Sequence, residues 1–383
     1  MAAFAETAAA LCGRWESWFA EAALPFWRER GWNPATGLAY ERLDLGGVPD
    51  RDSPLRVRTQ ARQIFALAHA ERLGVARGAQ AEAEAAFAAL LPRARAPDGH
   101  AGWVHVLAAS GAVADPSRDL YDHAFVLLML AHLHGGGLAV DDELAAVLAA
   151  LAAVFEAPHG GHAETGAGGT PRRQNPHMHL FEAFLALFEE TGDRRFLARA
   201  DALYELFRTR FVDAEAGIVR EFFATDWSLL PDDGSDWLEP GHLMEWVWLL
   251  RRYARHRPVA VDTLCARLFA RGEALGRQPP TATFLLDAVA ANGAVLTASR
   301  RLWVQTEYLK ALLVQARATD DAALAERCRR VSDALFTTYL GETPAGTWRD
   351  RFGADGALAV DHIPASTLYH LLGVLTELRL ATA

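Results

Sequence analysis

Lysine is almost absent from this chain: Lys310 is the only lysine among 383 residues, whereas arginine is abundant. Schiff-base catalysis needs a placed lysine, and phosphate-binding P-loops carry one in the pattern GxxxxGK followed by serine or threonine. That pattern does not occur, and neither does the dinucleotide-binding pattern GxGxxG. The sequence therefore gives little indication of a phosphate-cradling loop or of dinucleotide binding.

Positive charge and long apolar runs are also scarce. The formal net charge of −10 leaves no basic surface for a phosphate backbone, so we expect no nucleic-acid partner. No uncharged apolar run of about 18 residues occurs, which argues against a membrane span. The N-terminal segment is apolar, but Glu6 and Arg14 interrupt it and no basic region precedes it. We expect an ordinary amphipathic helix there rather than a signal peptide.

Cysteine is rare as well. Cys12, Cys265 and Cys328 are odd in number and far apart, which argues against a disulfide framework and against a cysteine-based zinc site. A reducing cytoplasm is therefore the expected compartment. The sequence leaves a monomer and a homodimer equally open.

Helical periodicity dominates what the chain does contain. No linker rich in Pro, Gly and Ser interrupts it, and a hydrophobic content of 51% can bury one large core, so we predict a single domain over residues 1–383. Apolar residues recur at helical spacing in twelve segments, which fall into six consecutive pairs. The segments are 3–31, 53–74, 77–92, 118–134, 140–155, 176–191, 193–211, 239–255, 258–275, 301–318, 320–339 and 364–381.

The connections between these segments are of two kinds. Some are very short, as at Thr191-Gly192-Asp193 and His256-Arg257-Pro258, and predict that each pair is an antiparallel helical hairpin. Others are long and carry strand-like alternation with turn residues, which predicts β-hairpin inserts at one end. These longer segments are 99–117, 217–237, 292–300 and 346–364.

Polar residues mark the second helix of each pair at nearly even spacing. One marker from each helix gives separations of 60, 57, 63, 63 and 65 residues, from Arg62 through Asp122, His179, His242, Gln305 and His370. An open solenoid of helix pairs would show the same period. Solenoid repeats tend to repeat their residues, however, and these six motifs differ. We therefore predict an all-α (α/α)6 barrel, with the marked helices as its inner ring.

Two of these motifs carry basic and acidic residues near a helix start. Arg58 and Arg62 lie four apart on an otherwise apolar helix; they are either surface arginines or, for Arg62, a guanidinium that binds sugar hydroxyls or an oxyanion. Asp119 and Asp122 have the positions of helix-capping residues, and Tyr121 could line a pocket mouth beside them.

The motif at 172–190 begins with Asn175 as the expected helix cap and Pro176 as the first helical residue. His179 and Glu182 then lie three apart on one face. A metal could use such ligands, but His177 and His179 are two apart and point to different faces of a helix, so we expect no metal.

The last three motifs contain the candidate acid, base and stacking residues. His242 and Glu245 lie three apart, so Glu245 could orient His242 for acid-base catalysis, or the two could form a structural pair. Trp303 and Glu307 lie four apart, where the tryptophan could stack on a sugar ring or pack in the core. His370 alone would be a core histidine. Because buried polar groups need partners, their recurrence in register indicates that they converge in one pocket.

The strings RQNPHMHLFEA, EPGHLMEWVWLL and RLWVQTEYLKALL and the closing YH resemble the N-acylglucosamine 2-epimerase superfamily over nearly the whole chain, and most closely its mannose isomerase branch. The resemblance implies an (α/α)6 barrel with chemistry at C2 of an aldose that needs neither metal nor cofactor. His242 and His370 resemble the two catalytic histidines, and Arg62 resembles the arginine that holds the substrate oxygen. Further positions implied for the pocket are His179, Glu245, Asn175, Trp303, Glu307 and Tyr121.

We therefore predict a cytoplasmic sugar isomerase of the D-mannose/D-fructose type. His242, oriented by Glu245, would open the sugar ring, and His370 would move the proton between C2 and C1 through a cis-enediolate stabilised by Arg62. A 2-epimerase acting on an N-acylglucosamine or cellobiose-type sugar would share these motifs. A glycoside hydrolase would need two flanking carboxylates, and a protein-binding helical scaffold would need no histidine pair. Selectivity is expected to depend on loops 159–174 and 342–363.

Overall fold

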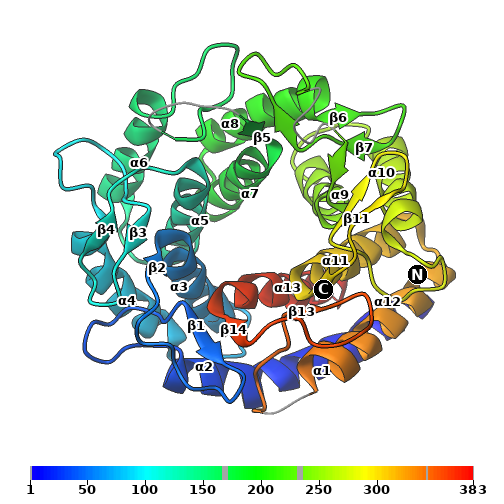
Figure 1. Ribbon diagram of the computed structural model, residues 1–383, viewed down its shortest axis with the longest axis horizontal. Coiled ribbons are helices and arrows are strands. Elements are labelled where there is room, and N and C mark those ends of the chain that lie inside the picture. Colours follow the sequence, from blue (N-terminus) through cyan, green and yellow to red (C-terminus); the bar gives the residue numbers. More distant parts are fainter. Residues whose placement is uncertain (1, 166–170, 231–235, 342–343, 383) are drawn as a thin grey trace.

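The computed structural model describes residues 2–165, 171–230, 236–341 and 344–382. Helices form two concentric rings, and the chain passes once around them (Figure 1). The inner ring consists of α3 (Val57–Arg72), α5 (Leu120–Gly135), α7 (Gln174–Thr191), α9 (Pro240–Ala254), α11 (Leu302–Thr319) and α13 (Leu368–Thr382). The outer ring consists of α1 (Ala2–Trp18) continued by α2 (Leu24–Arg30), then α4 (Ala79–Ala94), α6 (Asp141–Ala153), α8 (Arg194–Leu206), α10 (Asp262–Gly276) and α12 (Ala322–Leu335).

The inner ring is complete. Each inner helix contacts the next one, and α13 contacts α3, so the last inner helix lies against the first. An open solenoid is excluded by this contact, and the predicted all-α (α/α)6 arrangement is confirmed.

Burial follows the hydrophobic pattern of each ring. In α5 every residue from Asp122 to Leu133 is buried, as expected for a helix that is apolar on all sides. In α12 the buried residues recur every three or four positions, at Ala325, Cys328, Val331, Ser332 and Leu335. The outer helices thus cover the core with one face, and the inner helices lie within it. No helix in the described part of the chain has the length and apolar character needed to cross a membrane.

The hairpins differ from the predicted pairs by one helix. The short connection Thr191-Gly192-Asp193 joins α7 to α8, so the tight turn follows an inner helix instead of leading into one. Gly192 adopts a positive φ of 70° there, and Asp193 accepts a hydrogen bond from the Arg195 backbone N–H at 2.9 Å to cap α8. Each inner helix is therefore paired with the outer helix that follows it, and α13 packs against α1. The predicted hairpin at Thr191-Gly192-Asp193 is confirmed, but the prediction that the marked helix is the second of each pair was wrong.

Short strands lie in all four long segments, as predicted. Hairpins form between β3 (Val106–Leu107) and β4 (Val113–Asp115), β6 (Val212–Asp213) and β7 (Ile218–Val219), and β10 (Ala288–Ala290) and β11 (Val295–Thr297). The other strands pair across larger sequence distances: β1 (Arg42–Asp44) with β14 (His362–Pro364), β2 (Leu55–Arg56) with β3, β5 (Arg172–Arg173) with β8 (Phe222–Phe223), β9 (Trp237–Leu238) with β10, and β12 (Arg300–Arg301) with β13 (Arg351–Phe352).

These pairings fix the starts of the inner helices. Strands β2, β5, β9 and β12 end directly before or one residue before α3, α7, α9 and α11, and β14 precedes α13 by a 3-10 turn at Ala365–Thr367. Neighbouring segments therefore hold one another in place at the end of the ring where all inner helices begin. Of the loops expected to govern selectivity, residues 166–170 and 342–343 lie outside the described part.

Candidate active site

The predicted site residues gather at the end of the ring where the inner helices begin. Each lies within the first two turns of its helix, and each helix is a different one: Arg62 in α3, Tyr121 in α5, His179 in α7, His242 in α9, Trp303 in α11 and His370 in α13. The N-terminus of a helix carries a partial positive charge because its first backbone N–H groups have no partners within the helix. The N-termini of six helices therefore surround the candidate site, and together they stabilise negative charge that develops on a bound molecule.

His242 is held by a residue that the sequence analysis missed. Its Nδ1 lies 2.9 Å from Oε1 of Glu221, which belongs to the segment between β7 and β8. The other oxygen of Glu221 accepts a hydrogen bond at 2.9 Å from the Gln174 amide, whose own oxygen accepts one at 2.7 Å from the Trp246 indole N–H. Every member of this chain is buried. The prediction that Glu245 orients His242 was wrong.

The surroundings of His242 favour its charged form. Burial alone would disfavour the imidazolium, but the carboxylates of Glu221, Glu239 and Glu245 outweigh it and raise the pKa of His242 to about 9. Glu239 lies 4.0 Å from the His242 Nε2, and it also pairs with Arg301 at 3.2 Å. His242 is thus a proton donor at neutral pH.

His370 has the opposite character. Its Nδ1 lies 2.8 Å from Oε1 of Glu307, and the second oxygen of Glu307 pairs with the Lys310 amine at 2.6 Å. Burial, with the positive charges of Arg62 and Lys310, holds the pKa of His370 well below the ordinary histidine value. His370 is therefore neutral and suited to accept a proton.

Glu307 differs from its predicted role as a substrate-binding residue. Its side chain is fully buried, one of its oxygens faces His370, and the other faces Lys310. It has the orienting position toward His370 that was predicted for Glu245 toward His242.

Trp303 lies close to both histidines. The centroid of its ring is 5.2 Å from that of His242 and 5.6 Å from that of His370. The indole is only partly buried, so one surface remains for a ligand. An acid and a base beside an aromatic surface suit a sugar ring, whose C–H faces stack on aromatic groups.

Arg62 is a buried cation without an acidic partner among the described residues. Its side chain is 6% exposed, and its guanidinium carbon lies 3.9 Å from the ring centroid of Phe125 and 5.0 Å from that of Tyr369. One terminal nitrogen donates to the Tyr121 hydroxyl at 2.9 Å, and Nε has no partner. A buried guanidinium in this state has unused donors for a substrate oxygen.

His179 links this group to the carboxylates beneath it. Its Nδ1 lies 3.0 Å from Glu182, and its Nε2 lies 3.5 Å from the Tyr121 hydroxyl and 3.9 Å from Glu245. Burial lowers the pKa of His179 to about 4, against the opposing effect of Glu182. Glu182 also accepts a hydrogen bond from the Tyr369 hydroxyl. The predicted convergence of His179, Tyr121 and Arg62 is present.

Glu245 lies in this group of carboxylates, away from the Nδ1 of His242. Both of its oxygens are buried without a hydrogen-bond partner. Burial and the nearby Glu307 raise its pKa well above the ordinary glutamate value, so the neutral acid is favoured. As an acid it could donate a hydrogen bond to a bound molecule.

Two sets of side chains have atoms close enough to ligate a metal ion. In His179, Glu182 and Glu245, and again in Glu245, Glu307 and His370, the candidate ligand atoms lie within 4.8 Å of one another. In each set the histidine Nδ1 already faces a carboxylate of the same set, at 3.0 Å for His179 and 2.8 Å for His370. These contacts engage one oxygen of Glu182 and one of Glu307, whereas both oxygens of Glu245 are without a hydrogen-bond partner.

Asn175 differs from its prediction. Helix α7 begins at Gln174, so Asn175 lies inside the first turn and does not cap it. Its side-chain oxygen is buried without a partner, which leaves it as a possible ligand contact. The missed residues are Glu221, Gln174 and Lys310. Glu221 had one weak sequence signal, because with Arg220 it forms a charged pair between the apolar residues 218–219 and 222–223.

A proton donor, a proton acceptor and a buried cation without an acidic partner among the described residues, together with an aromatic surface, define a site for acid-base chemistry. Comparison with known proteins then gives the family: residues 39–374 match the N-acylglucosamine 2-epimerase family, and the chain belongs to it. The predicted resemblance is confirmed.

Individual relatives span most of the chain. A mannose-6-phosphate isomerase of Rhizobium meliloti (strain 1021) is 38% identical over 379 residues, which cover 96% of each chain. A D-mannose isomerase of Thermobifida fusca is 30% identical over 341 residues, which cover 82% of this chain and 81% of the relative. The solved structure of cellobiose 2-epimerase from Bacillus thermoamylovorans B4167 has the same fold, with a TM-score of 0.85 and 18% identity over 96% of this chain and 98% of that chain.

Proposed function

We propose that this protein is a sugar isomerase that interconverts an aldose and a ketose, of the D-mannose and D-fructose type. The observation that carries the proposal is the pair His242 and His370, which both lie beside Trp303 and have opposite preferences for charge. The names of the two relatives above, isomerases of mannose or of its 6-phosphate, support the same chemistry.

Ring opening uses the charged histidine. His242 donates its proton to the ring oxygen, the bond between that oxygen and C1 breaks, and the anomeric hydroxyl gives its proton to water. The product is the open-chain aldehyde, and His242 is left neutral. Trp303 holds the chain between the two histidines.

Proton transfer between carbons uses the neutral histidine. His370 takes the hydrogen from C2, and the electron pair moves to O1 to form a cis-enediolate, whose charge Arg62 and the helix N-termini stabilise. The neutral His242 carries the O2 proton to O1. His370 then returns its proton to C1, which completes a ketose with its carbonyl at C2.

The arginines beside the site favour an uncharged sugar over its phosphate. Arg58 is paired with Asp122 at 3.0 Å, and Arg301 is paired with Glu239 at 3.2 Å. A phosphate would have to displace these carboxylates. We therefore expect free D-mannose to react faster than its 6-phosphate.

The alternative is a 2-epimerase acting on an N-acylglucosamine or cellobiose-type sugar. The family name and the cellobiose 2-epimerase structure favour it, and the same enediolate would serve. The outcome differs only in the last step, in which C2 regains a proton on the opposite face instead of C1.

Product analysis in deuterated water decides between these reactions. The enzyme is incubated with D-mannose, D-mannose 6-phosphate, cellobiose and N-acetylglucosamine, and products are identified by NMR. We expect D-fructose from D-mannose, with deuterium at C1 to the extent that the proton held by His370 exchanges with solvent before it is returned. Deuterium at C2 of an epimer would replace the isomerase by the epimerase, and no reaction with any sugar would contradict both.

Variants test the assigned residues. His242→Ala and His370→Ala should each lose at least about 100-fold in turnover, as expected when a general acid or base is removed. His100→Ala is the matched control, because His100 is exposed and lies outside the site. Normal turnover in either site variant, with the fold retained by circular dichroism, would overturn the assignment.

We also propose that the reaction needs no metal ion and takes place in the cytoplasm. Arg62 and the N-termini of the inner helices supply the positive charge that a metal would otherwise supply to the enediolate. Turnover should survive exhaustive treatment with EDTA and should not rise on addition of Mg²⁺ or Mn²⁺; loss that either ion restores would contradict this. The three cysteines are free and buried, which fits a reducing compartment.

A further inference from the structure

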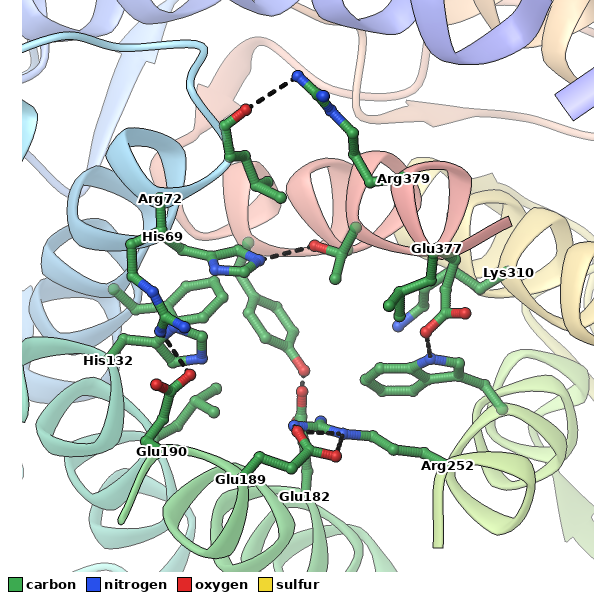
Figure 2. A pocket seen from close by; sticks show the side chains of 18 of the residues that line it. His69, Arg72, His132, Glu182, Glu189, Glu190, Arg252, Lys310, Glu377 and Arg379 are labelled. Atoms are coloured by element: carbon green, nitrogen blue, oxygen red, sulfur yellow. Dashed lines mark hydrogen bonds and ion pairs between the residues drawn. The ribbon is translucent and has the colours of Figure 1, made fainter. Parts of the chain in front are cut away.

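Lys310 lies between the candidate active site and a cavity at the other end of the ring. This cavity has a volume of about 750 Å³ and is lined mainly by the C-terminal halves of the inner helices. Figure 2 shows it from close by, with Lys310 and Glu182 among the labelled side chains that surround it. Lys310, Glu182 and Tyr369 line this cavity, while their partners Glu307 and His179 belong to the active site.

A continuous chain of contacts connects Lys310 to His370. The amine lies 2.6 Å from one oxygen of Glu307, and the other oxygen lies 2.8 Å from the His370 Nδ1. The side chains of Lys310 and Glu307 are 1% and 0% exposed, so water screens this pair little.

The protonation of Glu307 decides which nitrogen of His370 carries hydrogen. An ionised Glu307 only accepts, so the hydrogen sits on Nδ1, and Nε2 keeps the lone pair that removes a proton from carbon. A protonated Glu307 donates to Nδ1 instead, and the hydrogen of the neutral ring moves to Nε2. In that state His370 cannot act as the base.

The buried position of Glu307 by itself favours its protonated form, in which His370 cannot act as the base. Burial raises the pKa of Glu307, and Lys310 is the partner that opposes this effect most strongly. We propose that Lys310 is a positioning residue that keeps Glu307 ionised and thereby leaves the His370 Nε2 free as the catalytic base. This proposal rests on the proposed function. No other lysine exists in the chain.

The surroundings of Lys310 are built to hold its charge there. Its nitrogen lies 3.4 Å from the ring centroid of Trp248, a cation–π contact in a desolvated place. Gly373 of α13 leaves room for its stem, because a Cβ at that position would come within 3.3 Å of the Lys310 Cδ and 3.4 Å of its nitrogen. The helices α9 and α13 thus shape the position of a side chain from α11.

Several charged groups face His370 besides Lys310, and each affects its titration. They are Arg62 from α3, His179 and Glu182 from α7, Glu245 from α9 and Glu307 from α11. A variant at Lys310 changes none of these side chains directly. Lys310 also lowers the pKa of His370 directly, so the ring nitrogen that carries hydrogen, and not the pKa of His370, reports on the Lys310–Glu307 pair.

The test compares Lys310→Met with Lys310→Arg and Gly373→Ala. Ring nitrogens are observed by NMR in protein labelled with ¹⁵N-histidine, with the His370 signals assigned by their loss in His370→Asn. We expect the wild type to carry hydrogen on Nδ1 at neutral pH, and Lys310→Met to carry it on Nε2. This readout needs no substrate, so it tests the positioning role even if no sugar reacts.

Kinetics supply the second readout. Lys310→Met should lower kcat by about 100-fold or more, the usual contribution of a general base, with KM little changed because Lys310 does not face the sugar. Lys310→Arg should restore the Nδ1 form and part of kcat, and Gly373→Ala, which displaces the amine, should lower kcat less than Lys310→Met. An Nδ1 hydrogen and wild-type kcat in a folded Lys310→Met protein would overturn the proposal.

Discussion

At the scale of single residues, the site depends on His242 and His370. The sequence gives no sign that their protonation differs, but their neighbours in the fold give them opposite preferences for charge. Both are buried, and burial disfavours the charged ring in each. Carboxylates surround His242, whereas Arg62 and Lys310 face His370. The sign of the nearby charge therefore decides which histidine holds a proton, and an acid and a base are present at the same pH.

Glu221 should set the alkaline limit of activity. His242 must be protonated to open the ring, so kcat/KM should be constant at neutral pH and fall as the pH passes the His242 pKa of about 9. Glu221→Gln removes a negative charge that favours the imidazolium, so the pKa of His242 falls and the alkaline limb moves to lower pH. Activity at pH 6 should change much less than activity at pH 8.

A pH profile of kcat/KM for both proteins measures this shift. Glu326→Gln is the matched control, because Glu326 is exposed on α12 and pairs only with Arg329 nearby. An unchanged alkaline limb in Glu221→Gln would show that Glu221 does not govern the charge of His242.

At the scale of elements, the start of each inner helix is the functional unit. The spacing of His242 and Glu245 indicated an orienting pair, but in α9 these two residues contact different neighbours. Glu245 turns toward α7 and α11, and His242 meets Glu221 from the strand segment beside it. Helical spacing predicted which residues lie at the end of the ring that carries the site. The strand segments determine which of these residues contact one another.

Gly241 should matter because it lets α9 approach α11. A Cβ on Gly241 would come within 2.8 Å of the Trp303 ring and 3.2 Å of Val304. Gly241→Ala should therefore displace Trp303 relative to the two histidines and lower kcat/KM clearly. It should do so even though alanine stabilises a helix by about 1 kcal/mol relative to glycine. The matched control is Gly13→Ala in α1, where no atom lies within 4 Å.

Thermal unfolding and steady-state kinetics of both variants separate the two effects. Gly13→Ala should raise the melting temperature and leave kcat/KM unchanged. If Gly241→Ala also keeps wild-type kcat/KM, the position of Trp303 does not depend on this glycine.

At the scale of the whole molecule, the outer ring is closed by contacts between its first helix, α1, and its last helix, α12. The Trp15 indole N–H in α1 donates to the Ser332 hydroxyl of α12 at 3.0 Å, and Arg14 pairs with Asp333 at 2.7 Å. Residues more than 300 positions apart are thus in contact. Because no helix of the inner ring lacks a neighbour on either side, we predict that the chain unfolds as one domain.

Calorimetry tests this prediction. We expect one transition whose calorimetric and van't Hoff enthalpies agree, and we expect Trp15→Ala to destabilise the fold by about 3–5 kcal/mol while it still unfolds in one step. Two separate transitions in the wild type would contradict the single-domain organisation.

The sequence by itself determined the number and approximate limits of the helices, the six-step ring and the six helix starts that carry the site. It could do so because helical periodicity and the family motifs can be read from the residues of each segment alone. The tertiary structure alone decided the pairing of hairpins, the partner of His242 and the roles of Glu307 and Lys310. Those depend on distances across helices and on which buried charges face one another, and residue spacing along one helix does not contain that information.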